Sequence, residues 1–200
     1  MTETLETGDI LLFTSESTGI MGIFSSLIKW PTHSNYTHVA MVLKDPDFVT
    51  PPLKGLYVWQ SGWEGRPDPQ DNKIKLGVQI TPLQQILDDY KDGHVFYRKT
   101  NSYETFTNEN LKKIHKTVYE KPYDIILSDW IKAFIQKDDT PHKTDRFWCS
   151  ALVAYIYTIC GILDEKTDWT IVRPCDFGLS SENLIYRNNY FLENSEKRIQ

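Results

Sequence analysis

The sequence lacks the patterns that mark a metal site or a disulfide framework. Its 200 residues include only three cysteines, at positions 149, 160 and 175, and five histidines. No cysteine pair has the Cys-x-x-Cys spacing of zinc ligands, and the histidines show no ligand spacing with one another. An odd number of cysteines in a chain of this size also argues against paired disulfides. We therefore expect no metal, no cofactor and a reducing compartment.

An excess of positive charge and a long apolar run are also missing. The 22 Lys and Arg residues are outnumbered by 27 Asp and Glu, which gives a formal net charge of −5 and argues against a nucleic-acid partner. No apolar run reaches the ~20 residues of a membrane-spanning helix. The first six residues, MTETLE, resemble no signal peptide. These features predict a cytoplasmic protein without an integral membrane segment, and they leave the oligomeric state open.

No repeat, low-complexity tract or linker divides the chain, so we expect one α+β domain over residues 1–200 with a frayed polar tail at 191–200. Short apolar or β-rich runs predict strands at 10–13, 37–43, 56–61 and 94–98. Helical periodicity and stop signals predict helices at 17–30, 81–93, 108–120, 124–136 and 149–161. In the second of these helices, Thr81 is expected to cap, with Pro82 at the first position and Gln84 completing a capping box.

The apolar stretch from Gly19 to Trp30 is too short to span a bilayer. Packing into the domain explains it most simply. Two alternatives are that part of it lines a groove for an acyl chain or makes a peripheral contact with a membrane surface. Trp59 fits core packing, whereas Trp63, at the start of a Gly- and Pro-rich loop, is a candidate for an exposed rim around a substrate.

The most informative stretch is Arg146-Phe147-Trp148-Cys149-Ser150-Ala151-Leu152-Val153, where a cysteine is predicted at the first turn of an apolar helix. Unpaired backbone N–H groups at a helix N-terminus favour the thiolate, and a thiolate is a nucleophile. Free cysteines are also among the most buried residues, so on this pattern alone a core role for Cys149 is equally acceptable.

A base and an orienting group are available on two predicted strands. His38 shares a strand face with Ala40 and Val42. Gln60 is a polar residue on the apolar face of the next strand, and it needs a partner there. If the two strands pair, the Gln60 carbonyl oxygen can accept from a ring N–H of His38, as in the triads of cysteine hydrolases. Taken alone, His38 also fits a structural histidine, and Gln60 fits an edge residue bonded to backbone or water.

In their order along the chain, these elements resemble the permuted NlpC-type papain-fold superfamily, which includes the YiiX-like proteins and the lecithin:retinol acyltransferases. The resemblance spans residues 8 to 185 and rests on the segments Gly8–Phe13, Tyr36–Ala40, Tyr57–Ser61, Lys121–Asp124, Trp148–Val153 and Arg173–Phe177. It implies a circularly permuted papain-like fold, in which an antiparallel sheet packs against helices.

The resemblance also implies roles. Cys149 is the expected nucleophile, His38 the base, and the backbone N–H of Cys149 a donor to the oxyanion. YiiX-like relatives usually carry glutamate where this chain has Gln60. An amide can fix the imidazole tautomer but cannot stabilise an imidazolium by its charge, so Glu64 is an alternative orienting group. Tyr36 and Arg146 are further candidates for contacts with the substrate or the oxyanion.

The expected activity is that of a cysteine-dependent hydrolase, which cleaves an amide or ester bond of a peptide, acyl-amide or lipid substrate through an acyl-thioester. One alternative is an acyltransferase or lipid-processing enzyme that uses the same thioester. The other is a non-catalytic binding domain on the same fold, which the missing glutamate makes plausible.

Overall fold

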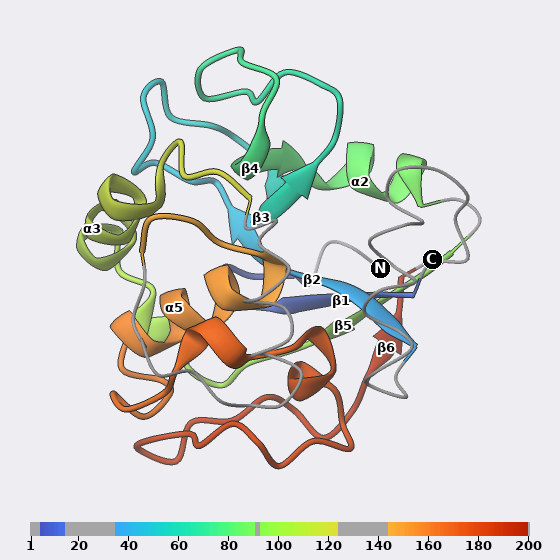
Figure 1. Cartoon of the computed structure of the whole chain (residues 1–200), viewed down its shortest axis with the longest axis vertical. Coiled ribbons are helices and arrows are strands. Elements are labelled where there is room, and N and C mark those ends of the chain that lie inside the picture. The colour runs from blue at the N-terminus through green and yellow to red at the C-terminus, as the bar shows by residue number, and fades with distance from the viewer. Residues whose placement is uncertain (1–4, 15–34, 91–92, 124–143, 200) are drawn as a thin grey trace.

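A computed structural model of the chain describes residues 5–14, 35–90, 93–123 and 144–199. The predicted helices at 17–30 and 124–136 lie outside these residues. A six-stranded sheet, in the order β4-β3-β2-β1-β5-β6, forms the centre of the structure (Figure 1). All its strand pairs are antiparallel. The strands are β1 (Ile10–Thr14), β2 (Tyr36–Lys44), β3 (Leu56–Trp63), β4 (Leu76–Pro82), β5 (His94–Arg98) and β6 (Lys197–Arg198).

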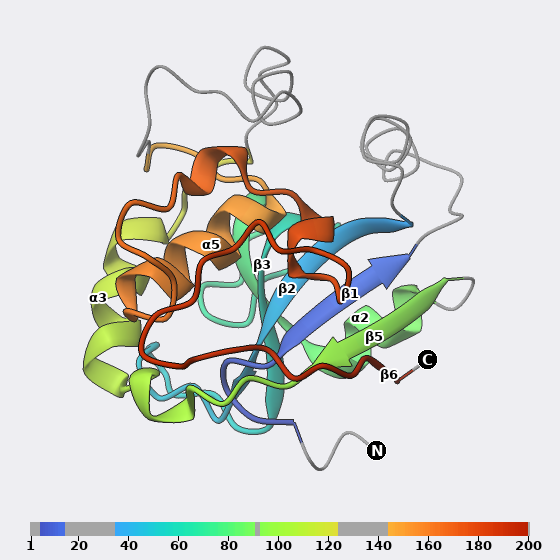
Figure 2. The same ribbon diagram turned by 90° about the horizontal axis from the view of Figure 1, so that it is seen from below.

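The α-helices among the described residues are α2 (Leu83–Asp89), α3 (Asn108–Val118) and α5 (Cys149–Ile159). Helices α3 and α5 lie on one side of the sheet and α2 lies on the other, as the turned view shows (Figure 2). Short 3-10 turns follow at η2 (Tyr103–Thr105), η3 (Trp169–Ile171) and η4 (Pro174–Phe177). The architecture is the α+β arrangement expected from the sequence, with an antiparallel sheet packed against helices.

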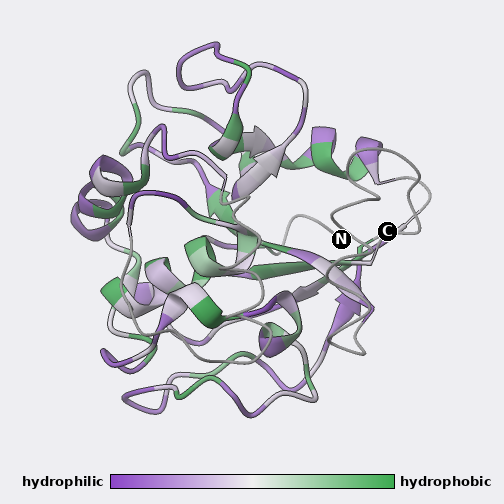
Figure 3. Ribbon diagram, viewed as in Figure 1, coloured by the Kyte–Doolittle hydropathy of each residue, from purple (hydrophilic) through white to green (hydrophobic). Residues whose placement is uncertain are grey.

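The two-residue period of β2 explains how the sheet is covered on both faces. Val39, Met41 and Leu43 belong to the core cluster under α5, whereas Ala40 and Val42 belong to the cluster under α2. Helix α5 is buried over almost its whole length and is apolar along the ribbon, while α3 keeps a hydrophilic outer face (Figure 3). A helix that is apolar all round belongs inside a protein.

Most predicted elements within the described residues are confirmed, but two strands, β4 and β6, were not expected. β4 occupies Leu76–Pro82 and pairs with β3 in the register Gln60↔Gln79 and Val58↔Thr81. The expectation that Thr81 caps the following helix is therefore wrong. Helix α2 begins at Leu83 after an N-cap at Pro82, and no side chain caps it. Thr81 is instead a buried strand residue.

The polar C-terminal residues also differ from the frayed tail expected at 191–200. Leu192 is buried, and its carbonyl oxygen accepts a hydrogen bond from Arg98 Nη2 at 3.2 Å. β6 pairs with β5, and the Ile199 N–H donates to the Val95 carbonyl oxygen at 2.8 Å. Backbone pairing and one buried apolar side chain hold this polar segment against the sheet, and composition alone predicts neither.

Candidate active site

The side chains of His38 and Gln60 meet where β2 and β3 stop pairing. The paired register of the two strands runs from Lys44↔Leu56 to Met41↔Trp59. Just beyond it, His38 Nε2 lies 2.7 Å from Gln60 Oε1. Both side chains are buried. Because an amide oxygen can only accept, this contact places the ring proton on Nε2 and leaves Nδ1 unprotonated in the neutral ring.

Cys149 is the first residue of α5, with Trp148 as its N-cap. Three hydrogen bonds hold this end of the helix. Trp148 Nε1 and Ser150 Oγ both donate to the Val172 carbonyl oxygen, at 3.2 and 2.7 Å. Ser61 Oγ on β3 donates to the Phe147 carbonyl oxygen at 2.6 Å. The strand that carries Gln60 is thus hydrogen-bonded directly to the segment just before Cys149.

The thiol of Cys149 lies beside the histidine strand. The backbone N–H of Val39, the residue after His38, is a hydrogen-bond donor to this thiol. Burial nevertheless raises the pKa of Cys149 to about 11, although the backbone N–H groups of Val39, Ser150 and Cys149 itself lower it. The N–H groups at the helix start therefore act in the expected direction, but desolvation outweighs them and the net pKa of the thiol is raised.

Burial acts on the base in the opposite direction. It lowers the pKa of His38 to about 4, while the hydrogen bond to Gln60 raises it. Burial thus favours the neutral form of both side chains, the imidazole of His38 and the thiol of Cys149.

Phe13 packs against the ring of His38, and Tyr90 packs against Phe13. The ring centroid of Phe13 lies 5.1 Å from that of His38 and 4.7 Å from that of Tyr90. The pKa of Tyr90 is raised by burial, and then by the charges of Glu64 and Cys149. Tyr90 is therefore within electrostatic range of both groups. The sequence patterns predicted no role at this site for Phe13, Tyr90 or Thr81.

Glu64 contacts Gln60 rather than His38. Its Oε1 accepts from Gln60 Nε2 at 2.9 Å, and the hydroxyl of Thr81 lies 3.2 Å from the same nitrogen. Of the two candidate orienting groups, Gln60 is the one in contact with the histidine. The role of Thr81 was missed because it was assigned to a helix cap, although the alternation in Val78-Gln79-Ile80-Thr81 is typical of a strand.

The other candidate residues differ in their contacts and in their burial. Tyr36 begins β2, and its hydroxyl donates to Glu196 in the C-terminal segment. Arg146 Nε is paired with Asp145 Oδ2 at 3.2 Å. Trp59 is fully buried and Trp63 is 38% exposed. Cys160 is buried and Cys175 is half-buried.

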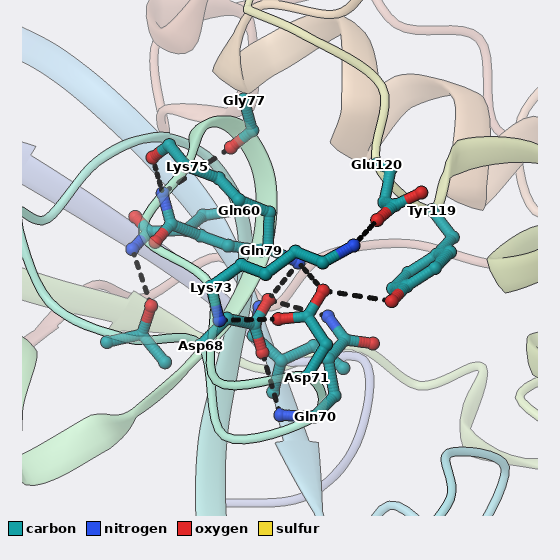
Figure 4. Close-up of polar contacts among 12 residues, drawn as sticks. Gln60, Asp68, Gln70, Asp71, Lys73, Lys75, Gly77, Gln79, Tyr119 and Glu120 are labelled. Atoms are coloured by element: carbon teal, nitrogen blue, oxygen red, sulfur yellow. Dashed lines mark hydrogen bonds and ion pairs between the residues drawn. The ribbon is translucent and has the colours of Figure 1, made fainter.

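A buried charge network anchors the loop between β3 and β4 (Figure 4). Lys75 Nζ lies 2.8 Å from Asp68 Oδ2 and 2.9 Å from Asp71 Oδ2. Asp68 Oδ2 also accepts from the backbone N–H of Ile80 on β4, and Asp71 accepts from the hydroxyl of Tyr119. This network ties the loop, which begins at Glu64, to β4 and to Tyr119.

In the described parts of the chain, no group of three or more His, Cys, Asp or Glu side chains is placed to hold a metal ion. Over the same residues, no helix has both the length and the apolar character needed to cross a membrane.

Comparison with known proteins identifies one family. Residues 4–171 match the family model described as permuted papain-like amidase enzyme, YaeF/YiiX, C92 family. No curated protein sequence matches the chain. The match covers β1 to β5, α5 and the loops between them, and so includes every residue of the His38–Gln60–Cys149 site.

Proposed function

We propose that this chain, which belongs to the YaeF/YiiX (C92) family of permuted papain-like amidases, cleaves an amide bond of a peptide-like substrate through a thioester on Cys149. The observation that carries the proposal is the 2.7 Å contact between His38 Nε2 and Gln60 Oε1. This contact leaves Nδ1 of the ring without a proton, so Nδ1 is the proposed proton acceptor. The next residue on β2 is Val39, whose backbone N–H donates to the Cys149 thiol.

In the first step, His38 Nδ1 takes the proton of the Cys149 thiol, and Sγ attacks the carbonyl carbon of the substrate. The tetrahedral oxyanion accepts from the backbone N–H of Cys149 at the start of α5. The imidazolium then gives its proton to the departing amine, and the C–N bond breaks. In the second step, His38 removes a proton from water, the hydroxide attacks the thioester, and the thiol and a carboxylic acid are released.

Labelling by acyl-amide and acyl-ester probes tests this assignment. We expect the wild-type chain to be labelled, with amide probes consumed, and the Cys149→Ala variant to stay unlabelled. Cys175→Ala is the matched control, because it removes a half-buried thiol that lies outside the proposed triad. His38→Ala should slow labelling by about a hundredfold or more, in the range that general acid–base catalysis contributes.

Labelling that persists in Cys149→Ala would contradict the assignment of the nucleophile. Transfer of the acyl group to an added amine or alcohol, in preference to water, would identify an acyltransferase instead. If Cys149 alkylates no faster than a model thiol at neutral pH, and His38→Ala does not change the rate, the chain is a binding domain on this fold.

A further inference from the structure

The amide of Gln60 is held at both of its ends. Oε1 faces His38 at 2.7 Å, while Nε2 donates to Glu64 Oε1 at 2.9 Å and to Thr81 Oγ1 at 3.2 Å. A carboxylate can only accept hydrogen bonds, so it selects the amide orientation that presents the NH₂ group to Glu64 and the oxygen to His38. Without that selection, a flipped amide would present a donor to the histidine ring and stabilise the wrong tautomer.

The neighbours of Glu64 define its charge environment. Arg66 Nη2 is paired with Asp89 Oδ1 at 2.7 Å, so the positive charge nearest in sequence is already shared with another carboxylate. The pKa of Glu64 is raised to about 7, chiefly by burial and also by the charge of Asp89, although the hydrogen bond from Gln60 and the charge of Arg66 act to lower it. The charge of Glu64 also acts on Tyr90, the C-cap of α2, and raises the pKa of its hydroxyl, although less than burial does.

We propose that Glu64, in its ionised form, is a positioning residue that acts through Gln60, giving the His38–Gln60 pair the negative charge that an amide lacks. The inference rests on the proposed function, because it explains how His38 is prepared as a base. A carboxylate that accepts from Nε2 draws electron density toward the amide oxygen, and this strengthens Oε1 as an acceptor for the imidazolium N–H. The charge of Glu64 thus acts on His38 through the side chain of Gln60, whose NH₂ group and oxygen are both hydrogen-bonded.

Alkylation of Cys149 by iodoacetamide over a range of pH tests this proposal without needing a substrate. In Glu64→Gln, which keeps the side-chain shape and removes the charge, we expect the alkylation rate at neutral pH to fall about tenfold, the size typical of lost outer-shell support. At alkaline pH, where hydroxide removes the thiol proton, the rate should match that of the wild type. Glu109→Gln on the exposed face of α3 is the matched control and should change nothing.

A double-mutant cycle separates positioning from a general structural effect. In a Gln60→Ala background, Glu64→Gln should have no further effect on the rate, because the relay is already cut. The exchanged pair, Gln60→Glu with Glu64→Gln, should recover most of the neutral-pH rate, since it places the carboxylate directly against His38 and an amide behind it. The melting temperature of Glu64→Gln is measured together with its alkylation rate. A lower rate supports positioning only if this melting temperature matches that of the wild type.

Three outcomes would overturn the inference. They are a wild-type rate in Glu64→Gln, an equal slowing by Glu64→Gln in the Gln60→Ala background, and an exchanged pair no faster than Gln60→Ala. These failures are distinguishable from failure of the proposed function. If probe turnover depends on Cys149 but not on Glu64, the hydrolase stands and the relay falls. If alkylation depends on the relay but no probe turns over, the relay stands and the hydrolase falls.

Discussion

At the scale of single residues, the site is governed by desolvation. Cys149 and His38 are both buried, and burial moves their pKa values in opposite directions, to about 11 and about 4. Neither group ionises on its own near neutral pH. In the proposed mechanism, the hydrogen bonds of Gln60 and the N–H groups around the thiol matter most when the proton moves from Cys149 to His38, because they would stabilise the ion pair that follows.

The buried histidine should make the protein sensitive to acid. The pKa of His38 is lowered from 6.5 to about 4, so the unfolded chain takes up the proton first and stability is lost as the pH falls through this window. The loss is limited to about 3 kcal/mol by the size of the shift. Glu64 acts in the opposite sense, because its raised pKa makes stability fall as the pH rises from 4.5 to about 7.

We therefore expect the effect of His38 to be visible in a Glu64→Gln background. Urea unfolding should show stability falling between pH 6.5 and about 4 in Glu64→Gln, and a flatter profile in the double variant that also carries His38→Gln. Equal profiles in the two variants would mean that His38 is not a buried neutral histidine.

At the scale of elements, the β3–β4 hairpin is linked by hydrogen bonds to the chain just before Cys149. Gly77 of β4 has a φ of 147°, and its backbone lies against the segment Lys121–Tyr123. Val78 N–H donates to the Lys121 carbonyl oxygen at 2.9 Å, and Phe147 N–H donates to the Pro122 carbonyl oxygen at 3.1 Å. The segment Lys121–Tyr123 thus connects β4 to the residues just before Cys149. It crosses β4 at Gly77, where there is no side chain in its way.

Gly77→Ala should disrupt this connection. The added Cβ would lie 2.3 Å from the Lys121 carbonyl oxygen, so we expect a loss of about 3 kcal/mol or more in unfolding free energy, together with a slower reaction of Cys149. Gly55→Ala is the matched control. Its φ is 103° and nothing lies within 4 Å of the new Cβ, so backbone strain alone should cost about 1 kcal/mol. Equal costs in urea unfolding would contradict the close approach.

At the scale of the whole molecule, the two ends of the described chain are joined at the sheet. The segment after Tyr190 lies along β5, and Glu196 accepts from the Tyr36 hydroxyl and from the Leu179 N–H. Tyr36 begins the strand that carries His38. The C-terminal segment therefore supports the start of the histidine strand from a distance of 160 residues in sequence.

Two neighbouring residues of this segment should differ sharply in their contribution. Leu192 is 5% exposed and belongs to the main core, so Leu192→Ala should cost about 2 to 4 kcal/mol in unfolding free energy. Phe191 is 50% exposed, so Phe191→Ala should cost less than about 1 kcal/mol. Thermal or urea unfolding measures both. A Leu192→Ala variant as stable as the wild type would mean that the segment does not pack as described.

The sequence by itself determined the elements that local patterns encode. The strands around His38 and Gln60 follow from alternation, and the helix that begins at Cys149 follows from an apolar run closed by Gly161. These patterns depend only on neighbours along the chain, so they were readable without the fold. The order of the motifs was also enough to indicate a permuted papain-like family, to which the match over residues 4–171 assigns the chain.

Only the tertiary structure decided which side chains meet. β4 was not predicted, and Thr81 was assigned to a cap, because a short strand that ends in Thr-Pro also carries the local signal of a helix start. The Glu64–Gln60 contact depends on a loop folded by buried charges, and the tail depends on backbone pairing with β5. The pKa values of Cys149 and His38 depend on burial. Burial results from the packing of many elements, so no single segment of the sequence predicts it.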